Sequence, residues 1–327
     1  MTHTASVIIP AHNAGHMIDR CLRALDRQTV HPLEIIVVDD GSTDNTADVA
    51  RLAGASVLSQ PARGAAAARN LGARHAAGDV LLFTDADCEP ADTWVEMMLI
   101  PFDDPSIAGV KGTYCTHQRE LTARFVQLEY EDKYRRMARL PQIDFIDTYS
   151  AGYRRDIFLA HGGFDESFPR ANVEDQEFSF RLAASGHKMV FQPAAVVGHR
   201  HAAHPVSYLR KKFWIGYWKV KVHLRHPARA LSDSHTPPVL KLQILLLAGT
   251  IAGGGFGLMK AGGWIIALTS LVALLASMVP FIAWAWRKDR QVALVAPLYL
   301  AGRAGALGMG LATGILAQII QRLRRAR

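Results

Sequence analysis

The chain reads Val37-Val38-Asp39-Asp40-Gly41-Ser42-Thr43-Asp44 at one point and Leu82-Phe83-Thr84-Asp85-Ala86-Asp87 at another. Both stretches begin as an apolar run typical of a buried strand and end in carboxylates. In open α/β sheets, ligands bind beyond the carboxyl ends of the strands. Together the two stretches predict an α/β domain whose acidic strand ends bind a divalent cation and a diphosphate.

Strand-like and helix-like segments alternate around these two stretches. We expect strands at residues 6–10, 34–38, 55–58, 79–84 and 107–115, and helices at residues 17–28, 43–53 and 65–77. Further helices are expected at residues 119–140, 156–162 and 173–186, and late strands at residues 188–191 and 196–197. This alternation predicts a mostly parallel sheet covered by helices.

Charge and cysteine content narrow the class of protein. Of the 327 residues, 37 are Lys or Arg and 29 are Asp or Glu, and the excess of cations gathers at residues 210–229 and 322–327. Basic clusters beside apolar segments favour an anionic lipid surface. No nucleic-acid-binding pattern is visible, so no nucleic-acid partner is expected. The three scattered cysteines and the lack of a signal-peptide pattern predict a cytoplasmic, reduced domain.

The chain changes character after residue 204. Apolar residues recur at helical spacing among cations and tryptophans over residues 206–224, which is typical of a helix at a membrane interface. Packing against the catalytic domain is the alternative. We therefore divide the chain into a catalytic domain (1–204), a basic amphipathic helix with a linker (205–238) and a membrane region (239–327).

The membrane region holds three apolar segments. Residues 239–259 and 264–286 are long enough to span a bilayer, which takes roughly 20 residues. Residues 292–320 include Pro297 and Arg303, and an arginine near the bilayer centre costs about 2.5–3.5 kcal/mol. The distribution of basic residues favours a two-span hairpin with the third segment interfacial or re-entrant, and three spans are the alternative.

Two groups of residues point to a metal site. Asp85 and Asp87 follow a buried strand, and two carboxylates so close together can share one Mg²⁺ or Mn²⁺ ion. The alternative is an Asp-rich turn that caps the next helix. His199 follows a late strand and could complete the metal site, while Arg200 could face a phosphate. The alternative for these two is a solvated or interfacial position.

Other polar residues fit nucleotide binding and proton transfer. One aspartate of the Asp39-Asp40 pair could accept a hydrogen bond from a nucleobase, although an ordinary loop with a helix cap would look the same. Arg69 could bind a phosphate or a base through its forked guanidinium. Glu174 and Asp175 open a helix, where the helix dipole favours acidic residues. Alternatively, this acidic pair supplies a general base for an acceptor hydroxyl.

Taken together, these stretches resemble glycosyltransferase family 2, the inverting nucleotide-sugar transferases with the GT-A fold, over roughly residues 5–204. The similarity lies in Val7 to Asn13, Val37 to Asp44, Ala68 to Gly72, Thr84 to Asp87, Gly152 to Phe158, Gly162 to Glu166, and Glu174-Asp175 with Arg181-Leu182. The resemblance implies a UDP- or GDP-sugar donor, a Mg²⁺ or Mn²⁺ cofactor and a single catalytic base, Asp175.

The resemblance also implies roles for individual positions. The residues expected to bind the nucleotide sugar are Pro10, His12, Asn13, Asp39, Asp40, Arg69, Asp85, Ala86 and Arg200. The metal ligands would be Asp85, Asp87 and His199, while Gly152 and Glu174 would face the acceptor.

One departure from the family pattern predicts that the enzyme adds a single sugar and does not synthesise a polymer. Processive synthases of this family carry a Q-x-x-R-W motif, and the nearest stretch here, residues 210–214, does not fit it. We therefore expect transfer of one sugar to a lipid-linked or membrane-associated acceptor in cell-envelope assembly, at the inner membrane with the catalytic domain facing the cytoplasm. A polyprenyl-phosphate acceptor is the alternative. A nucleotidyltransferase and a non-catalytic sugar-binding module are less favoured.

Overall fold

The computed structural model describes residues 3–168, 173–230, 233–234 and 236–325. These residues form two compact units, which are described separately. The first contains the described residues up to 117, those of 134–200, and residues 233–234. The second contains residues 118–133, 201–230 and 236–325. The second unit therefore includes a segment, 118–133, that the sequence did not separate from the catalytic domain.

The first unit is built on one eight-stranded sheet with the order β3-β2-β1-β4-β7-β6-β8-β5. Its strands are β1 (Ala5–Ala11), β2 (Glu34–Asp40), β3 (Ser56–Gln60), β4 (Val80–Phe83), β5 (Cys88–Pro90), β6 (Ile107–Cys115), β7 (Ala151–Arg154) and β8 (Lys188–His199). Strands β1 to β4 are parallel, whereas β7 is antiparallel to both of its neighbours and β5 is antiparallel to β8. The sheet is thus mixed, with its parallel part at the strands that carry the predicted motifs.

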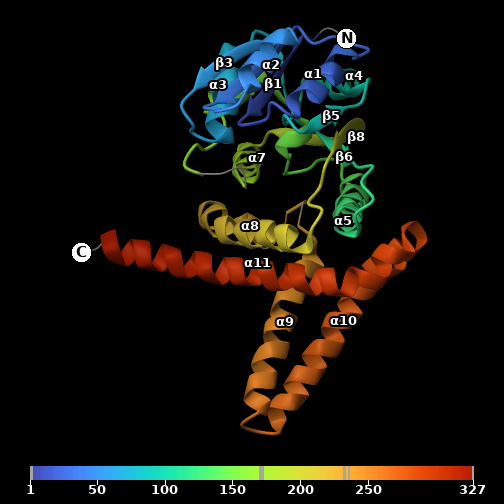
Figure 1. The fold of residues 1–327 in the computed structure, drawn as a ribbon. Helices are drawn as coiled ribbons and strands as arrows, with labels where there is room; N and C mark the ends of the chain where they lie inside the picture. Colours follow the sequence, from blue (N-terminus) through green and yellow to red (C-terminus); the bar gives the residue numbers. More distant parts are fainter. Residues whose placement is uncertain (1–2, 169–172, 231–232, 235, 326–327) are drawn as a thin grey trace. The chain divides into compact units, whose positions relative to one another are not determined.

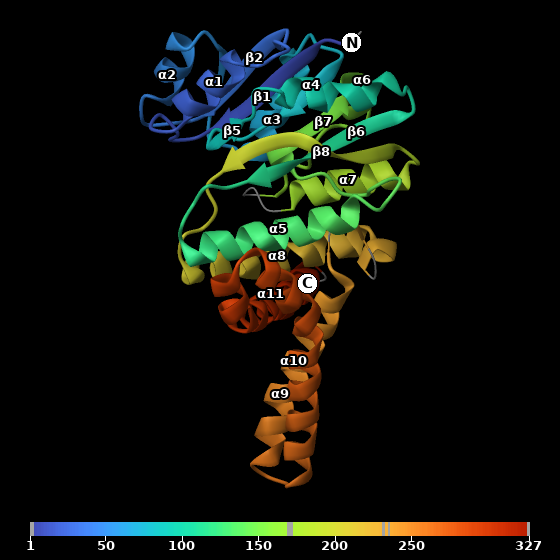
Figure 2. The same cartoon turned by 90° about the vertical axis from the view of Figure 1, so that its right-hand side faces the viewer.

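Helices cover this sheet, as Figure 2 shows for the first unit. They are α1 (Ile18–Asp26), α2 (Thr46–Leu52), α3 (Ala65–His75), α4 (Trp94–Leu99), α6 (Arg155–Ala160) and α7 (Glu174–Ala184), with 3₁₀ turns at Ile100–Asp103 and Thr148–Ser150. The alanine-rich helix α3 approaches the sheet closely. A Cβ on Gly72 would lie 2.6 Å from Ile8 Cγ2, so no larger residue fits without a shift. This close packing fixes α3 against β1 and β2.

The parallel register sets the position of the site. Ala11 on β1 lies opposite Asp39 on β2, and Ile8 on β1 lies opposite Phe83 on β4. The carboxyl ends of these three strands therefore meet at one edge of the sheet, where the sequence predicted that ligands bind.

The second unit consists of helices. They are the part of α5 (Leu121–Met137) up to Lys133, α8 (Pro205–Arg225), α9 (Pro238–Gly257), α10 (Gly262–Lys288) and α11 (Arg290–Arg325), with a 3₁₀ turn at Pro227–Ala230. Helices α9, α10 and α11 are long and apolar enough to cross a membrane. In Figures 1 and 2, α9 and α10 form a hairpin that leads away from α8 and α11, while α11 runs beside α8.

Candidate functional site

Hydrogen bonds join the ends of β1 and β2. The ring Nδ1 of His12 lies 2.9 Å from the carbonyl oxygen of Asp40. Asn13 adopts a left-handed φ of 51°, which asparagine tolerates better than most residues. Its N–H donates to Ser42 Oγ and its Oδ1 accepts from Thr43 N–H, both at 2.9 Å. The first-strand signature and the Asp39–Asp44 loop are therefore one connected structure.

The two neighbouring carboxylates on β2 differ in their surroundings. Asp40 accepts hydrogen bonds from Gln60 Nε2 at 2.7 Å and from the N–H groups of Arg63 and Gly64 at 2.8 and 2.7 Å. Asp40 thus shapes the approach to α3. Asp39 accepts from the nearby Ser42 N–H at 3.1 Å. Asp39 is therefore the better placed of the two for the predicted contact with a nucleobase.

Arg69 bridges two of the predicted motifs. Its Nη2 lies 2.7 Å from Asp85 Oδ1 and its Nη1 lies 3.1 Å from Glu174 Oε1. Only 2 % of Arg69 is exposed, because α3 packs it beneath the strand ends. The guanidinium therefore fixes Asp85, which follows β4, relative to the acidic start of α7. The predicted direct contact of Arg69 with the nucleotide sugar stays a prediction.

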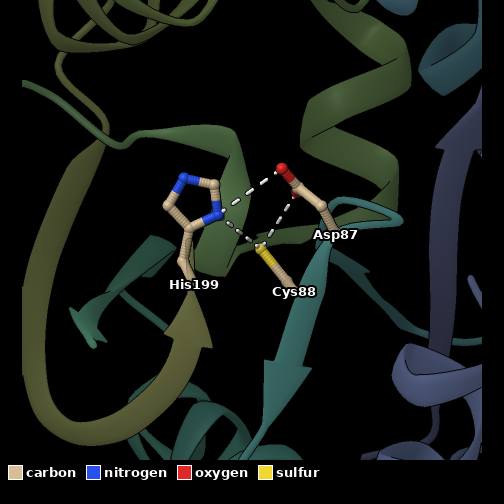
Figure 3. Close-up of side chains that lie close together, drawn as sticks. All are labelled: Asp87, Cys88 and His199. Atoms are coloured by element: carbon tan, nitrogen blue, oxygen red, sulfur yellow. Dashed lines mark hydrogen bonds and ion pairs between the residues drawn. The ribbon is translucent and has the colours of Figure 1, made fainter. Parts of the chain in front are cut away.

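Asp87, Cys88 and His199 form a cluster of three potential metal ligands (Figure 3). Cys88 on β5 pairs with His199 on β8, which brings the imidazole to Asp87 at 3.6 Å between Nδ1 and Oδ2. Tyr114 stacks on this imidazole with a centroid distance of 4.4 Å. Carboxylate and imidazole donors suit a divalent cation such as Mn²⁺. Of the predicted ligands, Asp87 and His199 come together here. Asp85 lies two residues before Asp87 in the chain, and its carboxylate pairs with Arg69.

Cys88 is the member of this cluster that the sequence did not suggest. Its Sγ lies 3.8 Å from Asp87 Oδ1 and 3.9 Å from His199 Nδ1. Burial, reinforced by the charges of Asp85 and Asp87, raises the pKa of the Cys88 thiol well above its usual value. The thiolate is the metal-binding form, and a bound cation itself favours it, so this raised pKa belongs to the metal-free site and leaves Cys88 a potential ligand.

Asp175 lies in the first turn of α7, beside Glu174. Burial and the charges of Glu174 and Asp147 raise the pKa of Asp175 well above that of an ordinary aspartate, and Arg69 offsets only part of this. A carboxylate with a raised pKa is a stronger base once it loses its proton, as general-base catalysis requires. Perturbed carboxylates of this kind gather at functional sites.

A buried ion pair near Asp175 was missed from the sequence. Lys111 Nζ contacts the carboxylate of Asp147 and lies 3.0 Å from Tyr149 Oη. Burial lowers the pKa of Lys111, although Asp147 and Asp175 oppose this. The available signal was a lysine inside the apolar strand β6, because a lysine is almost never fully buried unless it is paired.

Asn70 fixes the segment that follows α6. Its Nδ2 donates to the carbonyl oxygen of Phe164 at 2.8 Å, and its Oδ1 accepts from Phe164 N–H at 2.9 Å. Gly163 has a φ of +66°, and a Cβ there would lie 2.4 Å from Asn70 Oδ1. Two motifs that lie more than ninety residues apart in the sequence are therefore locked together.

The remaining predicted residues occupy varied positions. Pro10 and Ala86 are buried at the strand ends, and Arg200 is exposed. Gly152 lies inside the sheet on β7, where a Cβ would lie 3.0 Å from Met98 Cε and 3.1 Å from Leu82 Cδ2. Packing thus accounts for glycine at this position, and its place near an acceptor stays a prediction. Glu174 is buried against Arg69, so its acceptor-side role also stays a prediction.

Comparison with known proteins agrees with this geometry. The family model described as "Glycosyl transferase family 2" matches residues 6–162. The pre-mycofactocin glycosyltransferase of Mycobacterium tuberculosis is 28% identical over 273 residues, which are 80% of this chain and 55% of that protein. The chain thus spans about half the length of that relative. The O-antigen chain rhamnosyltransferase RfbN of Salmonella typhimurium is 29% identical over 64% of this chain and 71% of its own.

A solved structure shares the fold. The mannosyltransferase PcManGT from Pyrobaculum calidifontis, solved with GDP-Man and Mn²⁺, matches with a TM-score of 0.63 and 20% identity. The match covers 96% of this chain and 88% of that one. The family model falls on the sheet domain, where the strand-end carboxylates and the Arg69 bridge lie. Residues 6–162 thus form a glycosyl transferase family 2 domain, and together with the shared fold this match confirms the predicted GT-A fold class.

Proposed function

We propose that this protein is an inverting glycosyltransferase that moves one sugar from a nucleoside-diphosphate sugar to a membrane-associated acceptor. The observation that carries the proposal is the Arg69 bridge. It places Asp85, from the predicted metal motif, and Glu174-Asp175, from the predicted base motif, around one guanidinium. A transferase needs its leaving-group site and its base close together.

Each residue has a role in this proposal. Asp39 would contact the nucleobase, and Asp85, Asp87 and His199 would hold Mg²⁺ or Mn²⁺. When bound, the cation would neutralise charge on the leaving diphosphate. Asp175 would take the proton from the acceptor hydroxyl as its oxygen attacks the anomeric carbon from the face opposite the diphosphate. The bond from that carbon to the diphosphate then breaks, and the nucleoside diphosphate leaves. The names of the relatives support the class of reaction, and the divalent ion of PcManGT supports the metal.

The proposal includes the cellular setting. The described cysteines are all free, which fits a reducing compartment. The apolar helices α9, α10 and α11 fit attachment to a membrane. We therefore place the sheet domain on the cytoplasmic side of the inner membrane, with a lipid-linked or membrane-associated acceptor. A UDP- or GDP-sugar is the proposed donor.

The acceptor is either a hydroxyl or a polyprenyl phosphate, and Asp175→Asn distinguishes them. A hydroxyl needs a base, which contributes roughly 10²–10⁴-fold, whereas a phosphate is already ionised. We favour a hydroxyl, because the raised pKa of Asp175 suits a base. Asp175→Asn should then bind donor normally and lose at least about a hundredfold in turnover. Near-normal turnover would reject the base and favour the phosphate acceptor.

The pH profile gives a second readout. The raised pKa of Asp175 means that the wild-type base is protonated, and inactive, over a wider acidic range than an ordinary aspartate. Wild-type kcat/KM should therefore rise with pH through that pKa. The residual activity of Asp175→Asn should lack this rise. If the variant keeps the same acidic limb, another group is the base.

A further inference from the structure

A buried polar cluster in the second unit explains the arginine inside its longest apolar helix. Arg303 of α11 donates through Nη1 to Glu129 Oε1 at 2.8 Å and through Nη2 to Gln243 Oε1 at 3.0 Å. Lys212 Nζ lies 3.2 Å from Glu129 Oε2, and Tyr208 Oη donates to the same oxygen at 2.8 Å. Helices α8 and α11 therefore meet at the carboxylate of α5, and α9 joins the cluster through Arg303.

The contact with Gln243 shows at what height along helix α9 the side chain of Arg303 lies. Gln243 is the sixth residue of α9, which begins at Pro238, so it lies in the first third of that 20-residue helix. At about 1.5 Å per residue, the midpoint of α9 is roughly 7 Å further on. The guanidinium of Arg303 thus lies about midway between the start of α9 and its midpoint, off the centre of the hairpin where a charge costs most.

Helix α8 accompanies α11 closely through small residues. A Cβ on Gly302 would lie 3.1 Å from Leu209 Cδ2, and a Cβ on Gly216 would lie 2.5 Å from the carbonyl oxygen of Leu307. A Cβ on Gly314 would lie 2.6 Å from the carbonyl oxygen of Tyr217. The contacts advance together along both chains, so the two helices run in the same direction. Glycines allow helix backbones to approach this closely.

This pairing argues against α11 as a third span. If α11 crossed the bilayer, α8 would cross with it, and the exposed Arg210 and Lys211 would enter the hydrocarbon. Each such cation costs about 2.5–3.5 kcal/mol even on the lenient insertion scale, in addition to the cost of the Glu129 cluster. An interfacial position leaves these charges at the headgroups.

The exposed surface of α11 fits that position. Leu298, Met309, Leu316 and Ile320 are between 41% and 77% exposed along the helix, and exposed Arg322 and Arg324 follow them. A long helix with exposed apolar side chains and clustered cations is typical of a membrane surface that carries anionic lipid.

We propose that, among the helices of the described part of the chain, only α9 and α10 cross the membrane. Helices α8 and α11 then lie together in the interface of the leaflet where the hairpin starts, in contact with anionic headgroups. The end of α11 lies on the same side as the sheet domain, because β8 ends at His199 and α8 begins at Pro205, too few residues for a crossing. This inference does not depend on the sugar chemistry.

Cysteine labelling of the full-length protein tests the sidedness. In a Cys115→Ser background, which removes the one native cysteine that is not buried, single cysteines are introduced by Ala261→Cys, Gln321→Cys and Leu52→Cys. A membrane-impermeant maleimide should reach Ala261→Cys from one side, and Gln321→Cys and the sheet-domain control Leu52→Cys from the other. Labelling of Gln321→Cys from the same side as Ala261→Cys would establish three spans and overturn the proposal.

Nitroxide depth measurements in vesicles give an independent test. Labels at Met309→Cys and Ile320→Cys should report similar, shallow depths, whereas a label at Val272→Cys in α10 should be deep. A label at Met309→Cys as deep as the one at Val272→Cys would contradict an interfacial α11. Replacement of phosphatidylglycerol by phosphatidylcholine should move the Ile320→Cys label toward water. No movement would reject the contact with anionic headgroups.

Discussion

The Arg69 bridge predicts a large loss of stability in Arg69→Met. The side chain of Arg69 is 3% exposed, as is that of Glu174, whose Oε1 lies 3.1 Å away. Methionine fills similar space but removes the guanidinium that pairs with the buried carboxylate of Glu174. Removal of one partner of a buried ion pair costs about 3–5 kcal/mol. For a cooperative unit of about 150–250 residues, such as the sheet domain, that corresponds to a fall in the melting temperature of roughly 6–20 °C.

Thermal melts in detergent at neutral pH provide the measurement. Without Arg69, the buried carboxylate of Glu174 loses the guanidinium that pairs with it. Arg69→Met/Glu174→Gln should therefore recover part of the loss. Arg74→Met, at an exposed position of the same helix, should be neutral. A melting temperature for Arg69→Met equal to that of the parent would refute the bridge.

Three further predictions concern the metal, the base and the helical unit. Asp87→Ala should weaken Mn²⁺-dependent donor binding in calorimetry, and full activity of that variant with a chelator present would exclude the metal site. Asp175→Asn should melt at or above the wild-type temperature at neutral pH. The reason is that the pKa of Asp175 is raised, so its ionised carboxylate destabilises the fold at that pH. A lower melting temperature of the variant would count against a carboxylate with a raised pKa. Although burial alone would raise it, Lys212 and Arg303 hold the pKa of Glu129 at about 2. Glu129→Gln should therefore destabilise the protein by about 3–5 kcal/mol at neutral pH. The wild-type protein should lose this stabilisation as the pH falls from about 4.5 toward 2. Glu131→Gln is the control, because the side chain of Glu131 is 35% exposed, and an equal effect of that variant would argue against a buried cluster.

The sequence was sufficient for the strands that carry the site. The apolar runs that end at Asp40 and at Phe83 have the local pattern of buried parallel strands, and the structure has β2 and β4 there. The short strand β5 was missed, because three residues that contain Glu89 and Pro90 have no strand pattern of their own. Pairing with β8 creates it, and that partner lies more than a hundred residues away in the chain.

The sequence also could not predict which residues pair with the buried charges, because these partners lie far apart in the chain. Arg69 and Glu174 are 105 residues apart, and Arg303 and Glu129 are 174 residues apart. Local patterns could indicate that Arg303 was costly within an apolar segment, but not that a glutamate on an earlier helix neutralises it. The residue types of a motif predict its chemistry, whereas only the fold supplies the partners that set the pKa values of its side chains.

Release of nucleoside diphosphate is the measurement that tests the central claim most directly. Membranes that contain the protein would be incubated with a panel of UDP- and GDP-sugars, Mn²⁺ or Mg²⁺, and a membrane lipid extract as the source of acceptor. We predict that one donor yields nucleoside diphosphate together with a glycosylated product, and that Asp87→Ala abolishes both. Release of pyrophosphate would indicate a nucleotidyltransferase. Tight donor binding with no release from any donor would contradict the account and leave a sugar-binding module.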